Sequence, residues 1–108
     1  MPKALLLAWS QPTSPEVLGE FDNWYNATHA PQVCAAIGAK TPMTRYVNVE
    51  GTTGESDVSP KHLAIYEIED GDVATANSAL MEAVSGGRIN MSPTLDVTSG
   101  AMEWYVAR

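Results

Sequence analysis

The sequence predicts an α+β domain with the element order β-α-β-β-α-β, in which a four-stranded antiparallel sheet carries its helices on one face. Three observations lead to this prediction. Strand-like apolar segments recur along the chain, two stretches have apolar residues at the three- and four-residue spacing of amphipathic helices, and the two kinds of segment follow one another in this order. A chain of 108 residues has the size of one domain, so we expect a single domain over 1–108.

The first strand is expected at 3–10, where apolar residues fall on both faces and both faces therefore need cover. The first helix is expected to begin at Pro15, with Ser14 as its N-cap and Glu16 in its first turn. These residue types suit the start of a helix because a hydroxyl can accept from free backbone N–H groups, and a carboxylate is favoured at the positive end of the helix dipole.

The first helix is expected to run from Pro15 towards His29, with an apolar stripe at helical spacing. Proline lacks a backbone N–H and its ring clashes with the preceding turn, so Pro31 is expected to kink or end the helix near His29. A second short helical piece is expected over 32–37, ending at Gly38.

The rest of the chain supplies the remaining elements of the fold. Asp72 is expected to cap the second long helix, and Gly86 with Gly87 to end it. A polar turn region is expected at 51–60 and a long loop at 88–100. Strands are expected at 40–50, 62–69 and 101–107, and the second long helix at 72–85.

This order is the ferredoxin-like arrangement. Two helices cover only one face of such a sheet, yet the first and last strands carry apolar residues on both faces. The uncovered face would be a large apolar patch on a monomer. We therefore expect a homodimer in which a second copy covers that face.

Composition limits the partners of the protein. Thirteen Asp and Glu against six Lys and Arg give a formal charge of −7, and there is no basic stripe, so nucleic acid and anionic membrane surfaces would be repelled. No segment approaches the roughly 20 apolar residues of a membrane span. The single cysteine, Cys34, forms no internal disulfide and is interpreted as a small core residue. We expect a cytoplasmic protein whose partner is a small molecule.

Several stretches together resemble a known family. They are FDNWYNATHAPQV at 21–33, Gly38, the pair Arg45 and Tyr46, and HLAIYEIED at 62–70. In this order they resemble the EthD-like proteins of the dimeric α/β-barrel superfamily, over roughly residues 3–85. The resemblance implies a dimer in which two sheets form the barrel, with the helices outside and a cavity in each subunit between sheet and helices. Members of that superfamily include muconolactone-type isomerases, polyketide cyclases, fungal EthD-type dehydratases and cofactor-free monooxygenases.

His29 and Tyr25 are the candidate catalytic residues. They lie four residues apart, so they share a helix face and their side chains can meet. Imidazole is the natural general acid or base near neutral pH, and a tyrosine hydroxyl can donate to an oxyanion or orient the imidazole. The structural alternatives are a histidine that ends a helix and a core tyrosine. The resemblance favours the catalytic interpretation, because the His-x-Pro corner of the relatives faces the cavity.

Asp22, Trp24, Arg45 and Tyr66 are the candidate substrate-binding residues. Arg45 could bind a carboxylate or enolate, although an ion pair with Asp22 or Glu67 is modestly favoured. Trp24 is more readily explained by packing or a dimer contact. Tyr66 lines the cavity if its face of the strand looks towards the helices, and otherwise faces the dimer partner.

The residues point to proton transfer without a cofactor. Two histidines on different elements do not make a metal triad, and no glycine-rich phosphate loop is present, so we expect neither a metal nor another cofactor. The favoured hypothesis is a lyase- or isomerase-type enzyme that isomerises, dehydrates or cyclises a small apolar carbonyl or polyketide-like compound. The alternatives are a cofactor-free monooxygenase of an aromatic substrate and a non-catalytic small-molecule binding protein.

Overall fold

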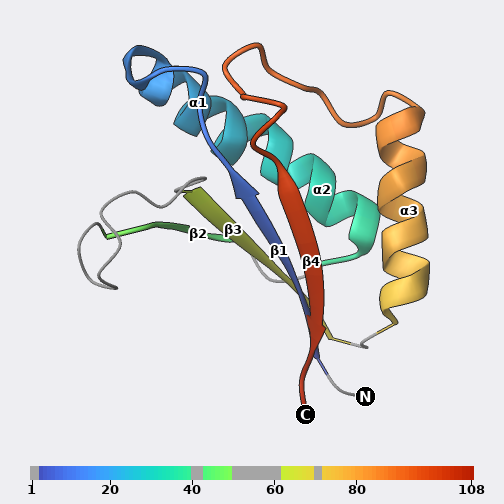
Figure 1. Cartoon of the computed structure of the whole chain (residues 1–108). Coiled ribbons are helices and arrows are strands. Elements are labelled where there is room, and N and C mark those ends of the chain that lie inside the picture. Colours follow the sequence, from blue (N-terminus) through green and yellow to red (C-terminus); the bar gives the residue numbers. More distant parts are fainter. Residues whose placement is uncertain (1–2, 40–42, 50–61, 70–71) are drawn as a thin grey trace.

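The computed structural model describes residues 3–39, 43–49, 62–69 and 72–108, and it has the predicted order of elements (Figure 1). One antiparallel sheet has the strand order β2-β3-β1-β4, and the helices lie on one side of it. The predicted ferredoxin-like arrangement is therefore confirmed. The strands are β1 (Ala4–Ser10), β2 (Thr44–Val47), β3 (His62–Ile68) and β4 (Ala101–Val106). The helical segments are η1 (Pro15–Val17), α1 (Leu18–Trp24), η2 (Tyr25–His29), α2 (Ala30–Ile37) and α3 (Val73–Ser85).

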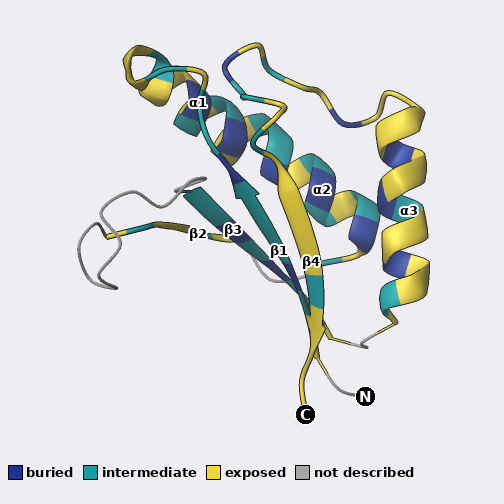
Figure 2. Ribbon diagram, in the orientation of Figure 1, coloured by how far each residue is buried: buried dark blue, intermediate teal, exposed yellow. Residues whose placement is uncertain are grey.

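The core lies between the sheet and the helices, where Figure 2 shows the buried residues on the facing sides of both layers. The largest fully buried side chains are Leu6, Phe21 and Tyr66. Leu6 of β1 pairs with Tyr66 of β3 and with Trp104 of β4, so these three residues share the helix-facing side of the sheet. This register settles the orientation of Tyr66, which alternation alone left open.

Pro31 was predicted to kink or end the helix near His29; the helical segments from η1 to α2 follow one another without a break, so the helix does not end there. Instead η2 is a π-helical turn, in which the Ala30 backbone N–H bonds to the Tyr25 carbonyl five residues earlier. This wider turn precedes the proline, and Pro31 then lies near the start of α2. A π turn leaves room for a residue that lacks an N–H and would otherwise clash with the turn before it.

Other predicted boundaries agree with the structure. Asp72 caps α3, because its carboxylate accepts a hydrogen bond from the Thr75 backbone N–H at 3.2 Å. Gly38 ends α2 with φ at +76°, a conformation that glycine adopts without strain. Ser14 occupies the first N-cap, but its side chain makes no capping hydrogen bond there.

Strand β2 spans Thr44–Val47, which is shorter than the predicted 40–50. The ends of that prediction, and the predicted polar turn at 51–60, fall outside the described residues. Within the described ranges, no helix has the length and apolar character needed to span a bilayer.

The face of the sheet opposite the helices is mostly apolar, and it also carries Glu67 and Glu103, which pair with Leu5 and Leu7. The β1 residues Leu5, Leu7 and Trp9 are half-buried on this face, and Tyr46 of β2 and Tyr105 of β4 remain about half exposed there. The described helices give this face no cover, as the sequence predicted.

Candidate functional site

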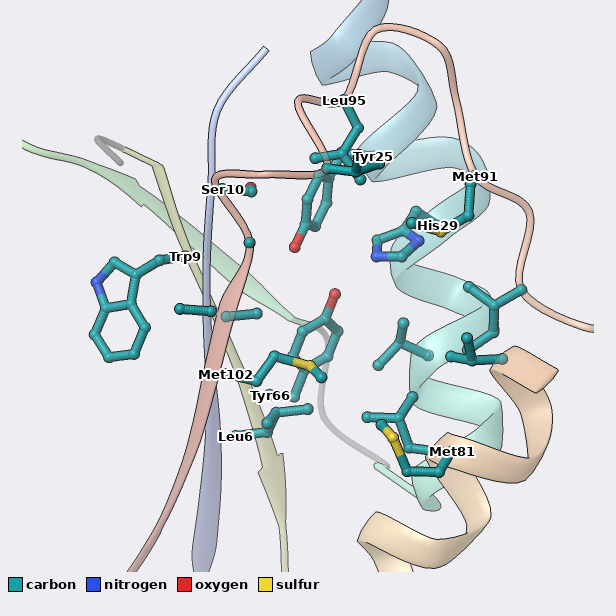
Figure 3. Close-up of a pocket in the computed structure, with 18 residues that line it drawn as sticks. Leu6, Trp9, Ser10, Tyr25, His29, Tyr66, Met81, Met91, Leu95 and Met102 are labelled. Atoms are coloured by element: carbon teal, nitrogen blue, oxygen red, sulfur yellow. The ribbon is translucent and has the colours of Figure 1, made fainter. Parts of the chain in front are cut away.

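A cavity of about 400 Å³ opens between the helix-facing side of the sheet, the helices and the 88–100 loop (Figure 3). This volume is in the range of small-molecule sites. Polar side chains are few in its lining and apolar ones many. The lining residues are Leu6, Ala8, Trp9, Ser10, Tyr25, His29, Val33, Tyr66, Leu80, Met81, Val84, Ile89, Met91, Leu95, Val97, Gly100, Ala101 and Met102. The Trp9 indole itself points away from the cavity, towards the opposite face of the sheet (Figure 3).

The 88–100 loop forms one wall of this cavity and is held by backbone hydrogen bonds. The Asn90 N–H donates to the side-chain oxygen of Gln32 on α2 at 2.7 Å. The Thr13 N–H donates to the Thr94 carbonyl at 2.8 Å, and the loop buries Ile89 against the core. The loop for which the sequence predicted no regular structure is therefore part of the pocket.

Tyr25, His29 and Tyr66 bring the polar groups of the cavity together (Figure 3). Tyr25 and His29 come from the two ends of η2, and their ring centroids lie 4.9 Å apart at an interplanar angle of 75°. Tyr66 reaches them from β3, and the hydroxyl ends of the two tyrosines point toward one another beside the imidazole. The predicted meeting of Tyr25 and His29 is confirmed, and the sheet adds a third group.

All three groups are uncharged near neutral pH, and burial moves the pKa of each further from neutrality. Loss of solvent lowers the His29 pKa from 6.5 to about 4, although the backbone of Asn90 opposes this shift. Burial raises the pKa of Tyr66 strongly. Burial also raises the pKa of Tyr25, against the opposing effects of the Tyr66 hydroxyl, the Arg45 charge and the Ser10 hydroxyl. The cavity thus presents two phenols and a neutral imidazole.

Two of these groups have unused hydrogen-bonding capacity. Among the described residues, the His29 Nδ1 and the Tyr66 hydroxyl are buried without a hydrogen-bonding partner in good geometry. The Tyr66 hydroxyl still lies close enough to that of Tyr25 to influence its ionisation. Native proteins pair most of their buried polar atoms, so unpaired atoms that face a cavity are candidates for ligand contacts.

Asp22 and Arg45 do not line the cavity. Their side chains form an ion pair at 2.8 Å, which confirms the structural alternative favoured from the sequence. The Arg45 guanidinium lies over the Tyr25 ring, 4.6 Å from its centroid. The pair therefore supports Tyr25 from outside the cavity.

Trp24 also lies outside the lining of the cavity. Its indole stacks on the His29 imidazole, with the ring centroids 4.6 Å apart and an interplanar angle of 28°. The Trp24 Nε1 is buried and, within the described part of the chain, has no hydrogen-bonding partner. Of the four predicted substrate-binding residues, Tyr66 is the one that the structure places in the cavity wall.

The structure adds residues that the sequence analysis did not single out. Ser10 lines the cavity, and its place two and four residues after Ala8 and Leu6 on the same face of β1 was an available signal.

Cys34 is half-buried, and burial raises the pKa of its thiol, which leaves it unactivated. No group of three or more potential metal-ligating side chains occurs in the described ranges.

Comparison with known proteins supports the fold. No family model matches the sequence, and no curated protein matches it. A solved structure of an ethyl tert-butyl ether D (EthD) family protein from Bacillus halodurans C-125 is similar, with 18% sequence identity and a TM-score of 0.52. The match covers 97% of this chain and 97% of that chain. The resemblance to the EthD-like proteins is thus confirmed at the level of the fold, which this chain shares along nearly its whole length.

Proposed function

We propose that the chain is a cofactor-independent enzyme that transfers a proton next to the carbonyl group of a small apolar compound. The observation that carries the proposal is the convergence of Tyr25, His29 and Tyr66 in an otherwise apolar cavity. Two of these three side chains have a buried polar atom without a partner among the described residues. A passive apolar carrier has no need for such a cluster.

In the proposed reaction His29 is the general base. Its neutral imidazole takes a proton from the carbon beside the carbonyl, and the hydroxyls of Tyr66 and Tyr25 donate hydrogen bonds to the oxygen as negative charge develops. Burial disfavours an isolated imidazolium, but here the imidazolium and the enolate form together and attract each other in a medium of low dielectric. Returning the proton elsewhere, expelling a leaving group or closing a ring would give isomerisation, dehydration or cyclisation.

A cofactor-free monooxygenase is the second candidate. The two protonated phenols that would hold an enolate would also hold a substrate anion that reacts with oxygen. Oxygen consumption in the presence of candidate phenols distinguishes this activity from proton transfer. A binding protein would instead retain its ligand unchanged.

We also propose that the protein acts as a homodimer. The apolar sheet face, with Leu7 of β1 near its centre and Tyr46 and Tyr105 at its sides, has the character of a surface covered by a partner. A second copy packed sheet to sheet would cover it and leave both cavities on the outer, helical side.

Deuterium exchange tests the proposed proton transfer without the natural substrate. The enolisable ketone 2-tetralone is incubated in D₂O with the full chain, and incorporation beside the carbonyl is followed by NMR. We expect catalysed exchange that His29→Gln lowers by roughly 10² to 10⁴-fold, the usual contribution of a general base. His62→Gln is the matched control, because His62 does not line this cavity. Equal exchange by the His29→Gln variant, folded as shown by circular dichroism, would refute the proposal.

A further inference from the structure

We infer that the natural substrate is an uncharged molecule whose hydrogen-bond-accepting oxygen lies against Tyr66, Tyr25 and His29, and whose hydrocarbon part fills the rest of the cavity. This inference rests on the proposed function and names the substrate class of that site. It separates uncharged ketones, lactones and quinone-like compounds from carboxylate-bearing compounds of the same size.

The lining of the cavity carries no formal charge. None of its described residues is a lysine, arginine, aspartate or glutamate. Its ionisable side chains are one imidazole and two phenols, which burial keeps neutral near pH 7. A carboxylate entering this cavity would lose its water without meeting a cation, which disfavours its binding.

The cation that contacts the Tyr25 ring is already paired. Arg45 lies over the outer side of the Tyr25 ring and is held by the Asp22 carboxylate at 2.8 Å. Neither residue lines the cavity, so the Arg45 guanidinium cannot form bidentate hydrogen bonds to an anion bound there. The formal charge of −7 on the whole chain adds a repulsive field for anions approaching from solvent.

The polar and apolar parts of the cavity are also separated. The Tyr25 and Tyr66 hydroxyls and the His29 ring meet at one place, whereas Met81 of α3 lies farther along the cavity (Figure 3). Leu80, Met81 and Val84 extend the apolar wall along α3. Methionine side chains adapt their shape to a ligand, which suits a hydrocarbon body without polar anchors. The cavity therefore matches an apolar molecule that has one hydrogen-bond acceptor at one end.

Binding of three matched probes to the full chain tests this inference independently of turnover. The probes are 2-tetralone, the hydrocarbon tetralin and tetralin-2-carboxylate, titrated at pH 7.5 with detection by NMR shifts. We expect 2-tetralone to bind at least about tenfold more tightly than the carboxylate, because the carboxylate must be desolvated without a counter-ion. Tyr66→Phe should weaken 2-tetralone binding about fivefold and leave tetralin unchanged, because a hydrogen bond contributes about 1 kcal/mol. Tyr46→Phe on the exposed face is the matched control.

Two results would overturn the inference. One is carboxylate binding as tight as ketone binding, and the other is failure of 2-tetralone to bind up to its solubility limit. The outcome is separable from that of the exchange experiment. If 2-tetralone binds as expected and is not exchanged, the substrate class stands and proton transfer is refuted. If the carboxylate binds best, the substrate class is refuted whatever the exchange rate.

Discussion

At the scale of single residues, the unusual feature is a histidine that is kept neutral. His29 lies between the Trp24 indole, stacked on one side of it, and the Tyr25 ring. These contacts fix the imidazole plane, and burial lowers its pKa from 6.5 to about 4. A histidine placed only to end a helix would sit in solvent, where the helix dipole raises its pKa. Its burial and ring contacts thus distinguish His29 from a solvent-exposed residue at a helix end.

The lowered His29 pKa has a consequence for stability. In the unfolded chain His29 takes up a proton near pH 6.5, whereas in the folded chain it does so only near pH 4. The unfolded state therefore binds more protons between these pH values, and folding weakens as the pH falls through that window. We expect the free energy of unfolding of the wild type to fall by roughly 2 to 3 kcal/mol more than that of His29→Gln between pH 7.5 and pH 4.5. Urea titrations at both pH values measure this. Equal losses in the two proteins would show that His29 titrates normally.

The sequence predicted part of this cluster and left part of it open. Spacing along one helix was enough to bring Tyr25 and His29 together, because residues four apart share a face. It left the side of Tyr66 undecided, because the first strand is apolar on both faces and either face could have met the helices. The ion pair of Arg45 with Asp22 was one of two pairings considered, and the register of β2 against β3 selects it. The side of Tyr66 and the partner of Arg45 depend on contacts between segments far apart in the sequence, and the periodicity of one segment gives no information about such contacts.

At the scale of elements, the π turn η2 carries the candidate catalytic pair. Its wider spacing accommodates Pro31 and determines how Tyr25 and His29 are presented to the cavity. The sequence predicted that Pro31 would kink or end the helix, from its missing N–H and its ring clash, but did not foresee a π turn that lets the helical segments continue past the proline. Such wide turns are often found at functional sites.

Replacing Pro31 tests the role of the π turn. Pro31→Ala restores a backbone N–H and permits a regular α-helix through this region. We expect the free energy of unfolding to stay equal or rise, and the rate of 2-tetralone exchange to fall about tenfold or more, because the side chains of Tyr25 and His29 shift relative to the cavity. Pro15→Ala at the start of the same helix is the matched control. A Pro31→Ala variant with unchanged exchange would show that the wide turn has no part in activity.

The 88–100 loop shows where prediction from sequence ends. Capping and glycine signals placed the limits of α3 well, because they are local. The loop has no periodicity, so its residues could not be assigned to a face. Its position depends instead on bonds to remote segments, such as that from the Asn90 N–H to Gln32. Leu95 and Met91 thereby become part of the cavity wall.

At the scale of the whole molecule, the sheet separates two surfaces of different surroundings. The helix-facing side holds the core and the cavity, and the opposite side is apolar without cover from the described helices. Alternation in the first and last strands predicted this second surface, and the fold confirms its position. In the proposed homodimer, a second copy of the chain covers this surface.

A charge placed on the open face tests the homodimer. Leu7 pairs with Ile65 on one side and Glu103 on the other, so it lies in the middle of the sheet. We expect the wild type to be a dimer by light scattering and Leu7→Glu to be a folded monomer, because a second carboxylate beside Glu103 would be desolvated next to a like charge at the centre of the face. Ala74→Glu on the exposed surface of α3 adds the same charge and should remain dimeric. A monomeric wild type at micromolar concentration would contradict the proposal.

The proposed role of buried, neutral His29 as the base leads to a specific pH dependence of 2-tetralone deuterium exchange, measured with the non-enzymatic rate subtracted at each pH. Because the base must be unprotonated, a pKa of about 4 predicts enzymatic exchange that is constant from pH 8 down to about pH 5.5 and begins to decline only below that. A decline centred near pH 6.5 would identify a solvent-exposed base, and no enzymatic exchange at any pH would contradict the account.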